Sequence, residues 1–223
     1  MDVLESALSQ GRKTLSEHES KLVLSCYEIP VIEEILAQNE SELKSALETL
    51  GFPVAIKACA PKITHKTDLD LIKLGLKTHE DALTAFRQIM TQMNQFEGGA
   101  ALIQKMANGK REFMAGMTRD PQFGPCVMFG LGGIFTEALD DVSFRVAPLS
   151  KMDASEMIRE IKSYKLLGAF RGMPPADLPR LENILVNLGR LGLENQRIQE
   201  IDINPLIIQE NIPVAVDALI VLN

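Results

Sequence analysis

Several features that assign proteins to familiar classes are missing from this chain or scarce in it. Its three cysteines form no CxxC pair, so we expect reduced, buried thiols at Cys26, Cys59 and Cys126. No uninterrupted apolar run reaches the about 18 residues of a membrane span. The start of the chain, Met1 to Glu5, has neither the basic nor the apolar segment of a signal peptide. These absences predict a cytoplasmic protein without a membrane partner.

Basic residues are also in the minority. The 30 Asp and Glu residues exceed the 23 Lys and Arg residues, which gives a net charge of −7 at pH 7. Because no basic stripe is available to neutralise phosphates, we expect no nucleic-acid partner. ATP is not excluded, since a few lysines, backbone amides and a metal ion can hold a triphosphate. A Walker A motif, an HExxH motif and a Ser-His-Asp order are absent as well.

The length of 223 residues allows one large domain or two small lobes that share a cleft. Capping signals and apolar spacing predict a first lobe with three helices, over about 16–26, 39–50 and 82–93, and a strand over 53–58. Asn39 is the expected N-cap of the second helix, and Gly51 is expected to end it. Because Gly98-Gly99 breaks the chain, we place the first lobe at about 12–99.

The second lobe, about 100–223, contains several consecutive strand patterns. The first two, 101–106 and 111–118, flank Asn108-Gly109, a dipeptide that predicts a tight hairpin. Further strands are expected over 125–129, 133–139 and 142–148. A helix is expected to begin at Asp153, which with Glu156 has the spacing of a helix cap, and another runs over 178–191. An Ile-rich hairpin follows after 198. Runs of consecutive strands beside helices predict an α/β (α+β) fold with mixed sheets instead of one all-parallel sheet.

The closing hairpin displays oxygen ligands at its polar positions. Alternation points Ile201, Ile203 and Val216 to a core and leaves Asp202, Asn204 and Asp217 on the other side. Carboxylate and amide oxygens suit a hard cation such as Mg²⁺ and not Zn²⁺. The pattern therefore predicts a magnesium site, although Asn-Pro also begins ordinary turns.

Two basic residues on strands are candidates for binding phosphate. Lys57 lies in an otherwise apolar strand, where a buried ammonium needs an anionic partner; a nucleotide phosphate and a structural carboxylate both meet that need. Arg145 lies on a polar strand face and could stabilise a phosphoryl group, or be solvated. The turn Gly130-Leu-Gly132-Gly133 would let backbone amides approach an anion, and tight hairpin packing explains its glycines equally well.

His65 is the candidate nucleophile. It lies among hydroxyl, cationic and carboxylate neighbours in Thr64-His-Lys-Thr-Asp68. A neutral imidazole is a nucleophile near pH 7, and phosphohistidine can pass on its phosphoryl group. A solvated, inert loop histidine is the alternative.

Separate motifs then occur in order along residues 12–220: Leu15-Ser-Glu-His-Glu-Ser-Lys21, Val54-Ala-Ile-Lys57, His65-Lys-Thr-Asp68, Lys73-Leu-Gly-Leu76, Gly109 to Gly124, Val127 to Gly133, Asp141-Val-Ser-Phe-Arg145, Phe170-Arg-Gly172 and Asp202-Ile-Asn-Pro205. Together they resemble the ATP-grasp (β) subunit of ADP-forming acyl-CoA (acetyl-CoA) synthetases. The resemblance implies an ATP-grasp fold of two lobes with the nucleotide between them. It also implies an acid–CoA ligase activity that interconverts acyl-CoA, ADP and phosphate with acid, CoA and ATP through phosphohistidine.

The resemblance also implies cofactors, partners and roles. ATP or ADP is the substrate, Mg²⁺ is the cofactor, and a CoA-binding α subunit completes a hetero-oligomer, a heterotetramer. The nucleotide would be bound by Lys57, Gln104, Lys105, Met106 and Glu112, and Mg²⁺ by Asn204 and Asp217. Asp202 would orient the incoming phosphohistidine, and His65 would relay the phosphoryl group between sites too far apart for one in-line transfer.

The chain departs from the family pattern after Asp68. The family has a residue followed by Gly-Gly, where this sequence has Leu69, Asp70 and Leu71. Asp70 would repel a triphosphate unless it turns away or helps to bind metal. One rival function follows from this departure: a catalytically impaired ATP-grasp subunit that regulates or scaffolds the complex. A second and separate rival is an ATP-grasp carboxylate ligase that works through an acyl phosphate, and His65 with its His-Lys-Thr-Asp context argues against it.

Overall fold

The computed structural model describes residues 2–61, 71–96, 98–133, 141–169 and 171–223. They form two compact units. The small unit comprises Ser16–His18 and Ile32–Ala107, and the large unit comprises Met1–Leu15, Glu19–Val31 and Asn108–Asn223. Each unit has its own hydrophobic core. The fold is therefore a two-unit α/β structure.

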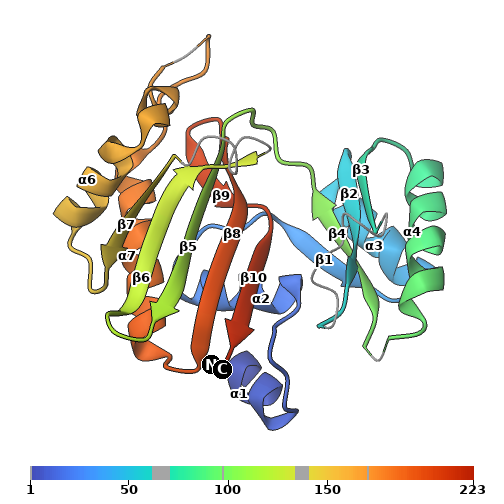
Figure 1. The fold of residues 1–223 in the computed structure, drawn as a ribbon. Coiled ribbons are helices and arrows are strands. Elements are labelled where there is room, and N and C mark those ends of the chain that lie inside the picture. The colour runs from blue at the N-terminus through green and yellow to red at the C-terminus, as the bar shows by residue number, and fades with distance from the viewer. Residues whose placement is uncertain (1, 62–70, 97, 134–140, 170) are drawn as a thin grey trace. The chain divides into compact units, whose positions relative to one another are not determined.

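The small unit is a four-stranded sheet with two helices. Its strands follow the order β1 (Glu34–Ala37), β4 (Ala100–Lys105), β2 (Val54–Cys59) and β3 (Ile72–Leu76). The helices α3 (Glu40–Leu50) and α4 (His79–Met93) pack on the same side of this sheet (Figure 1). The predicted caps of α3 are confirmed: the Asn39 side chain accepts a hydrogen bond from the amide of Glu42, and Gly51 ends the helix with φ 68°.

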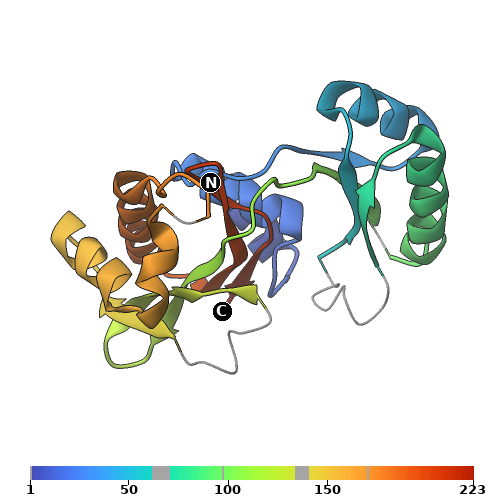
Figure 2. The ribbon, with the colours of Figure 1, turned by 90° about the horizontal axis from the view of Figure 1, so that it is seen from above.

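The large unit is built on a six-stranded sheet. Its order is β10 (Ala218–Leu222), β8 (Ile198–Gln209), β5 (Glu112–Asp120), β6 (Gly124–Leu131) and β7 (Val142–Val146), with β9 (Ile212–Ala215) paired to β8. Its helices are α1 (Asp2–Ser9), α2 (Glu17–Cys26, whose first two residues belong to the small unit), α6 (Lys151–Glu160), the 3₁₀ helix η3 (Lys162–Leu167) and α7 (Leu178–Glu194). Figure 2 shows α6 and α7 together on one side of β5, β6 and β7. Both helices therefore cover the same face of this part of the sheet.

Three expectations need correction. The Asn108-Gly109 hairpin is wrong, because β4 pairs with β1 and β2 whereas β5 pairs with β6 and β8. Gly109 instead allows close packing, since a Cβ there would lie 2.5 Å from the Ile208 carbonyl oxygen. For the same reason β4 belongs with the small unit, so the division lies after residue 107 and not at 99. Ser150, and not Asp153, is the N-cap of α6; Asp153 completes its capping box.

The strand pairings within both sheets are antiparallel among the described residues, where mixed sheets are expected from the sequence. Helices connect several of these strands, so alternation of helices and strands along the chain does not by itself dictate parallel pairing. None of the helices in the described part of the chain is long and apolar enough to cross a membrane.

Candidate functional site

The proposed metal ligands meet at a break in the ladder along one edge of β8. Strand β9 pairs with the second half of β8 and β10 with the first half, and the flanking pairs are Leu206–Ala215 and Ile203–Ala218. The two residues between these pairs on each side therefore face each other, and the amide of Val216 donates to the Pro205 carbonyl at 3.0 Å. This register places Asn204 opposite Asp217, within the reach of a cross-strand pair.

The other edge of β8 has a bulge at the same point. Two consecutive pairs with β5 are Phe113–Leu206 and Ala115–Ile203, with a register shift between them. Asn204 and Pro205 thus stand opposite the single residue Met114. A bulge bends a strand locally and redirects its side chains, and bulges are common beside active sites. Pro205, which has no amide hydrogen, fits a position outside the regular ladder.

Two carboxylates and an amide line the same face of β8. Glu200 is exposed, Asp202 is partly buried and Asn204 is exposed, while Ile201 and Ile203 between them are buried. The predicted alternation is therefore confirmed along β8, whereas Val216, which was expected in the core, is only partly buried. The pKa of Asp202 is raised to about 6 by burial and by the negative charges of Glu200 and Asp217.

This donor set fits Mg²⁺. The described residues contain no group of three or more His, Cys, Asp and Glu side chains that could hold a metal ion by itself. Mg²⁺ does not require such a cage, because it often binds one or two protein oxygens, waters and substrate phosphates. Asn204 and Asp217 supply such oxygens. Burial is the main cause of the raised pKa of Asp202, and a divalent cation beside these residues would offset the smaller contribution from the negative charges of Glu200 and Asp217.

In the small unit, Lys57 lies on the central strand β2, all six residues of which are buried. Val54, Ile56 and Ala58 belong to the core cluster beneath α3 and α4, so strand alternation directs Lys57 to the opposite face of the sheet. There its Nζ donates to Glu17 Oε1 at 2.7 Å, with the two side chains only 5% and 1% exposed. The structure thus contains the structural carboxylate that was the alternative partner for Lys57.

Gln104 shares that face with Lys57. Lys57 pairs with Leu102 and Ala55 pairs with Gln104, so Lys57 and Gln104 are diagonal neighbours. The Gln104 side chain is buried. The next two residues, at the end of β4 and just after it, have different contacts. Lys105 is exposed and lies 3.2 Å from Glu33, and the amide of Met106 donates to Pro53.

Glu112 begins β5 beside the glycine turn. Its carbonyl accepts a hydrogen bond from the amide of Gly132 at 3.0 Å. A Cβ on Gly130 would lie 2.5 Å from the Asp141 carbonyl, and one on Gly132 would lie 2.6 Å from the Phe113 carbonyl. Close backbone packing therefore accounts for these two glycines. Gly133 has φ 74°, and a Cβ there would lie 2.9 Å from Glu112 Oε2.

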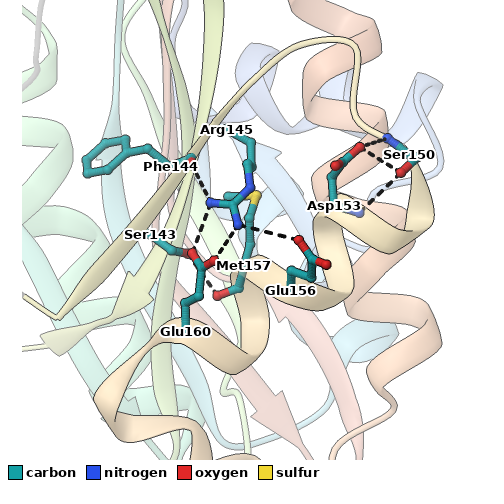
Figure 3. Close-up of polar contacts among 8 residues, drawn as sticks. All are labelled: Ser143, Phe144, Arg145, Ser150, Asp153, Glu156, Met157 and Glu160. Carbon is teal, nitrogen blue, oxygen red and sulfur yellow. Dashed lines mark hydrogen bonds and ion pairs between the residues drawn. The ribbon is translucent and has the colours of Figure 1, made fainter.

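Arg145 points from β7 towards α6, whereas Phe144 lies on the other side of the strand (Figure 3). Its guanidinium pairs with both carboxylate oxygens of Glu160, one of them at 2.9 Å, and lies 3.8 Å from Glu156. These contacts, led by the hydrogen bond to Glu160, raise the pKa of Arg145. To contact a phosphate, Arg145 would have to exchange these partners, and its role in binding ATP stays a prediction.

A family model for the ATP-grasp domain matches residues 6–222. The β subunit of acetate–CoA ligase (ADP-forming) I from Pyrococcus furiosus is 46% identical over 225 residues, which cover 99% of this chain and 97% of that protein. The chain belongs to the ATP-grasp family of ADP-forming acetate–CoA ligases. Acetate–CoA ligase (ADP-forming) I from Archaeoglobus fulgidus is 37% identical, and there the match spans 33% of a longer protein.

The fold of this chain is also similar to a solved structure. The Candidatus Korarchaeum cryptofilum acetyl-coenzyme A synthetase 1, in complex with coenzyme A and Ca-AMPCP, has a TM-score of 0.93 and 44% identity. The match covers 100% of this chain and 99% of that one. The ATP-grasp fold expected from the sequence is thereby confirmed.

Some predicted ATP-grasp residues lie outside the described part of the chain. His65 and Asp70 are among them. Leu71, the second departure from the family's Gly-Gly, is described: its side chain is 1% exposed in the core of the small unit, and its carbonyl accepts from the amide of Ala58. Leu71 therefore has a packing role.

Within the described part of the chain, sequence reasoning missed the roles of four buried charged residues, Glu17, Lys21, Asp141 and Arg111. Glu17 is one, and the unexplained charge of Lys57 was the signal that could have revealed it. Asp141 accepts from the amides of Lys162 and Ser163 and so begins η3. The Arg111 guanidinium donates to four carbonyls, those of Leu166, Gly168, Pro174 and Glu210. The Gly/Pro-rich connector after η3, which needs donors from elsewhere, was the available signal for Arg111.

Proposed function

We propose that this chain is the nucleotide-binding β subunit of an ADP-forming acyl-CoA synthetase. With a CoA-binding α subunit it would interconvert acyl-CoA, ADP and phosphate with acid, CoA and ATP. The observation that carries this proposal is the near-complete match to β subunits of such ligases. The position of Asn204 on β8 opposite Asp217, which lies between β9 and β10, supports it. Related structures contain coenzyme A and nucleotide analogues, including Mg-AMPPCP.

The residues divide the work by chemistry. Lys57, on one face of the small sheet, would bind the nucleotide phosphates. Gln104 on the same face, together with Lys105 and Met106 at the end of β4, would contact the base. Glu112 would bind the ribose or adenine, and Arg145 the phosphoryl group after release from Glu160. Asn204 and Asp217 would hold Mg²⁺, which would neutralise phosphate charge when bound. Asp202 would orient the phosphohistidine of the partner.

His65 would carry the phosphoryl group between nucleotide and partner. Its ring nitrogen would attack the γ-phosphorus of ATP, so that the N–P bond forms as the bond to the ADP oxygen breaks. A second transfer would pass the phosphoryl group to the partner's histidine, and the same steps reversed would make ATP. We also propose that the complex is cytoplasmic and that it is a heterotetramer. Light scattering of the purified complex would test the number of subunits.

The deciding experiment uses labelled ATP and the complex assembled with its α subunit. Wild type should acquire acid-labile label, and His65→Ala should transfer no label to the α subunit while it still binds ATP. Near-normal turnover by His65→Ala would refute the relay. Acyl phosphate trapped with hydroxylamine from the chain alone would favour the carboxylate-ligase alternative.

A scaffold subunit is the second candidate, and the Asp70–Leu71 departure supports it. Leu71 fills the core where the family has a glycine. In that case the assembled complex would show no protein phosphorylation from labelled ATP. Phosphorylation that appears in Leu71→Gly but not in wild type would indicate an activity lost through this substitution. Phosphorylation of wild type would indicate an intact activity.

A further inference from the structure

Glu17 and Lys57 form an ion pair in which both side chains are almost inaccessible to solvent. The Lys57 ammonium and the Glu17 carboxylate are 2.7 Å apart, with 5% and 1% of their side chains exposed. Lys57 projects from the central strand of the small sheet, on the face away from α3 and α4. An ammonium in such a position is stable only beside a negative charge.

The carboxylate is itself held in place. Glu17 is the first residue of α2, and the next residue, His18, places its Nδ1 3.0 Å from Glu34 Oε1. Glu34 is on β1, and its side chain is 6% exposed. The first turn of α2 is therefore fixed to the small sheet at two adjacent residues, one on β2 and one on β1.

The chemistry of an ammonium allows it to contact a carboxylate and a phosphate together, because it has three N–H donors. Lys57 donates to Glu17 Oε1 at 2.7 Å. A lysine side chain loses rotamer freedom when it is immobilised, and a carboxylate that already holds it lowers that cost in ligand binding. Protein kinases depend on a lysine–glutamate pair for the same purpose, with the lysine on the nucleotide phosphates.

We propose that Glu17 is a positioning residue: it holds the Lys57 ammonium, charged and oriented, for the phosphates of the nucleotide. The proposal rests on the proposed function, in which Lys57 binds those phosphates. Glu17 acts only through Lys57, and its removal should weaken binding of phosphate-bearing ligands while sparing adenosine. Its own negative charge would oppose phosphate, so the opposite outcome is a real alternative that the experiment distinguishes.

The test is a double-mutant cycle on the full chain, read by calorimetric titration with MgADP and with adenosine. Glu17→Gln keeps the size of the side chain and removes its charge, and it should weaken MgADP binding about tenfold with adenosine unchanged. Lys57→Met should weaken MgADP at least as much. Because Glu17 acts through Lys57, the double variant should bind MgADP no more weakly than Lys57→Met alone.

The outcomes separate the two hypotheses. Additive losses in the double variant, or tighter MgADP binding by Glu17→Gln, would overturn the positioning role. Unchanged MgADP binding by Lys57→Met would refute the proposed phosphate role of Lys57 instead. If Glu17→Gln does not fold, Glu17→Asp decides: it keeps the charge but withdraws the carboxylate, and wild-type MgADP affinity in that variant would also overturn the proposal.

Asp141→Asn serves as the matched control. It exchanges another buried carboxylate for an amide, in the large unit, where the carboxylate accepts from the backbone amides of Lys162 and Ser163. It should lower thermal stability yet leave MgADP affinity within about twofold of wild type. A comparable loss of affinity in this control would show that general destabilisation, and not Glu17, is being measured, which would also count against the proposal.

Discussion

Replacing Asp202 by Asn should stabilise the metal-free protein at neutral pH. The pKa of Asp202 is raised from 3.8 to about 6, chiefly by burial and then by Glu200 and Asp217. This rise corresponds to roughly 3 kcal/mol of lost stability when the group is ionised in the folded state. Asn has nearly the same shape and cannot ionise, so Asp202→Asn should raise the free energy of unfolding by up to about 3 kcal/mol at pH 8.

The sign follows from proton binding. Between about pH 4 and pH 6 the folded protein holds a proton on Asp202 that the unfolded chain has released. The contribution of Asp202 to stability therefore falls as the pH rises through this window and stays low above it. The advantage of Asp202→Asn should be large at pH 7–8 and should shrink towards zero as the pH approaches 4.

Urea unfolding of both proteins in EDTA, at several pH values from 4.5 to 8, measures this difference. Glu200→Gln is the matched control, because it removes one neighbouring charge and leaves Asp202 in place; it should give a smaller gain with the same pH trend. Adding Mg²⁺ should narrow the gap, since a cation at Asn204 and Asp217 favours ionised Asp202. A constant advantage at every pH, or none at pH 8, would refute the reasoning.

Three further predictions concern single groups. Asn204→Ala and Asp217→Ala should each weaken Mg-ATP binding by about ten- to a hundredfold without unfolding the chain; unchanged affinity by calorimetry in both would remove the metal assignment. Arg111→Met should lower the free energy of unfolding by at least about 3 kcal/mol, because the guanidinium donates to four carbonyls. Arg111→Lys should restore only part of this loss. A loss below about 1 kcal/mol for Arg111→Met in urea titration would contradict the prediction. Burial alone would raise the pKa of Asp141, but hydrogen bonds from Ser163 and the Lys162 amide lower it. Asp141→Asn should therefore be destabilising at pH 7, with a penalty that disappears as the pH falls through the lowered pKa; circular dichroism melts that show an equal penalty at pH 3.5 would refute it.

Local signals in the sequence predict most helices and strands, and they fail where the partner of a strand matters. Asn39 and Gly51 delimit α3 because their own side-chain and backbone preferences decide the ends of that helix. Asn108-Gly109 predicts a hairpin for an equally local reason, yet the strands on either side join different sheets. Strand pairing depends on packing against distant segments, which a dipeptide does not encode.

The candidate site divides in the same way. Alternation along β8 identifies Asp202 and Asn204 from neighbouring residues alone. The opposition of Asn204 and Asp217 depends on where β9 ends and β10 begins, and a two-residue difference in that connection would shift the register. Glu17 lies 40 residues before Lys57, so no periodicity connects them; only the cost of a buried ammonium indicates that such a partner must exist.

The energetic cost of each charge helps to distinguish functional residues from structural ones. The Arg145–Glu160 pair is partly exposed, with side chains 28% and 49% accessible, and such pairs are inexpensive to form and contribute little. Asp202 and the Glu17–Lys57 pair differ, because desolvation makes both expensive. A neutral side chain would be more stable than Asp202 in the metal-free fold. Buried Arg111 and Asp141 also lose hydration, but they recover its cost through hydrogen bonds with backbone groups of the fold. Rules of stability are broken mainly where function requires it, so at Asp202 and at Glu17–Lys57 we expect a cation and a phosphate to recover the cost when they bind.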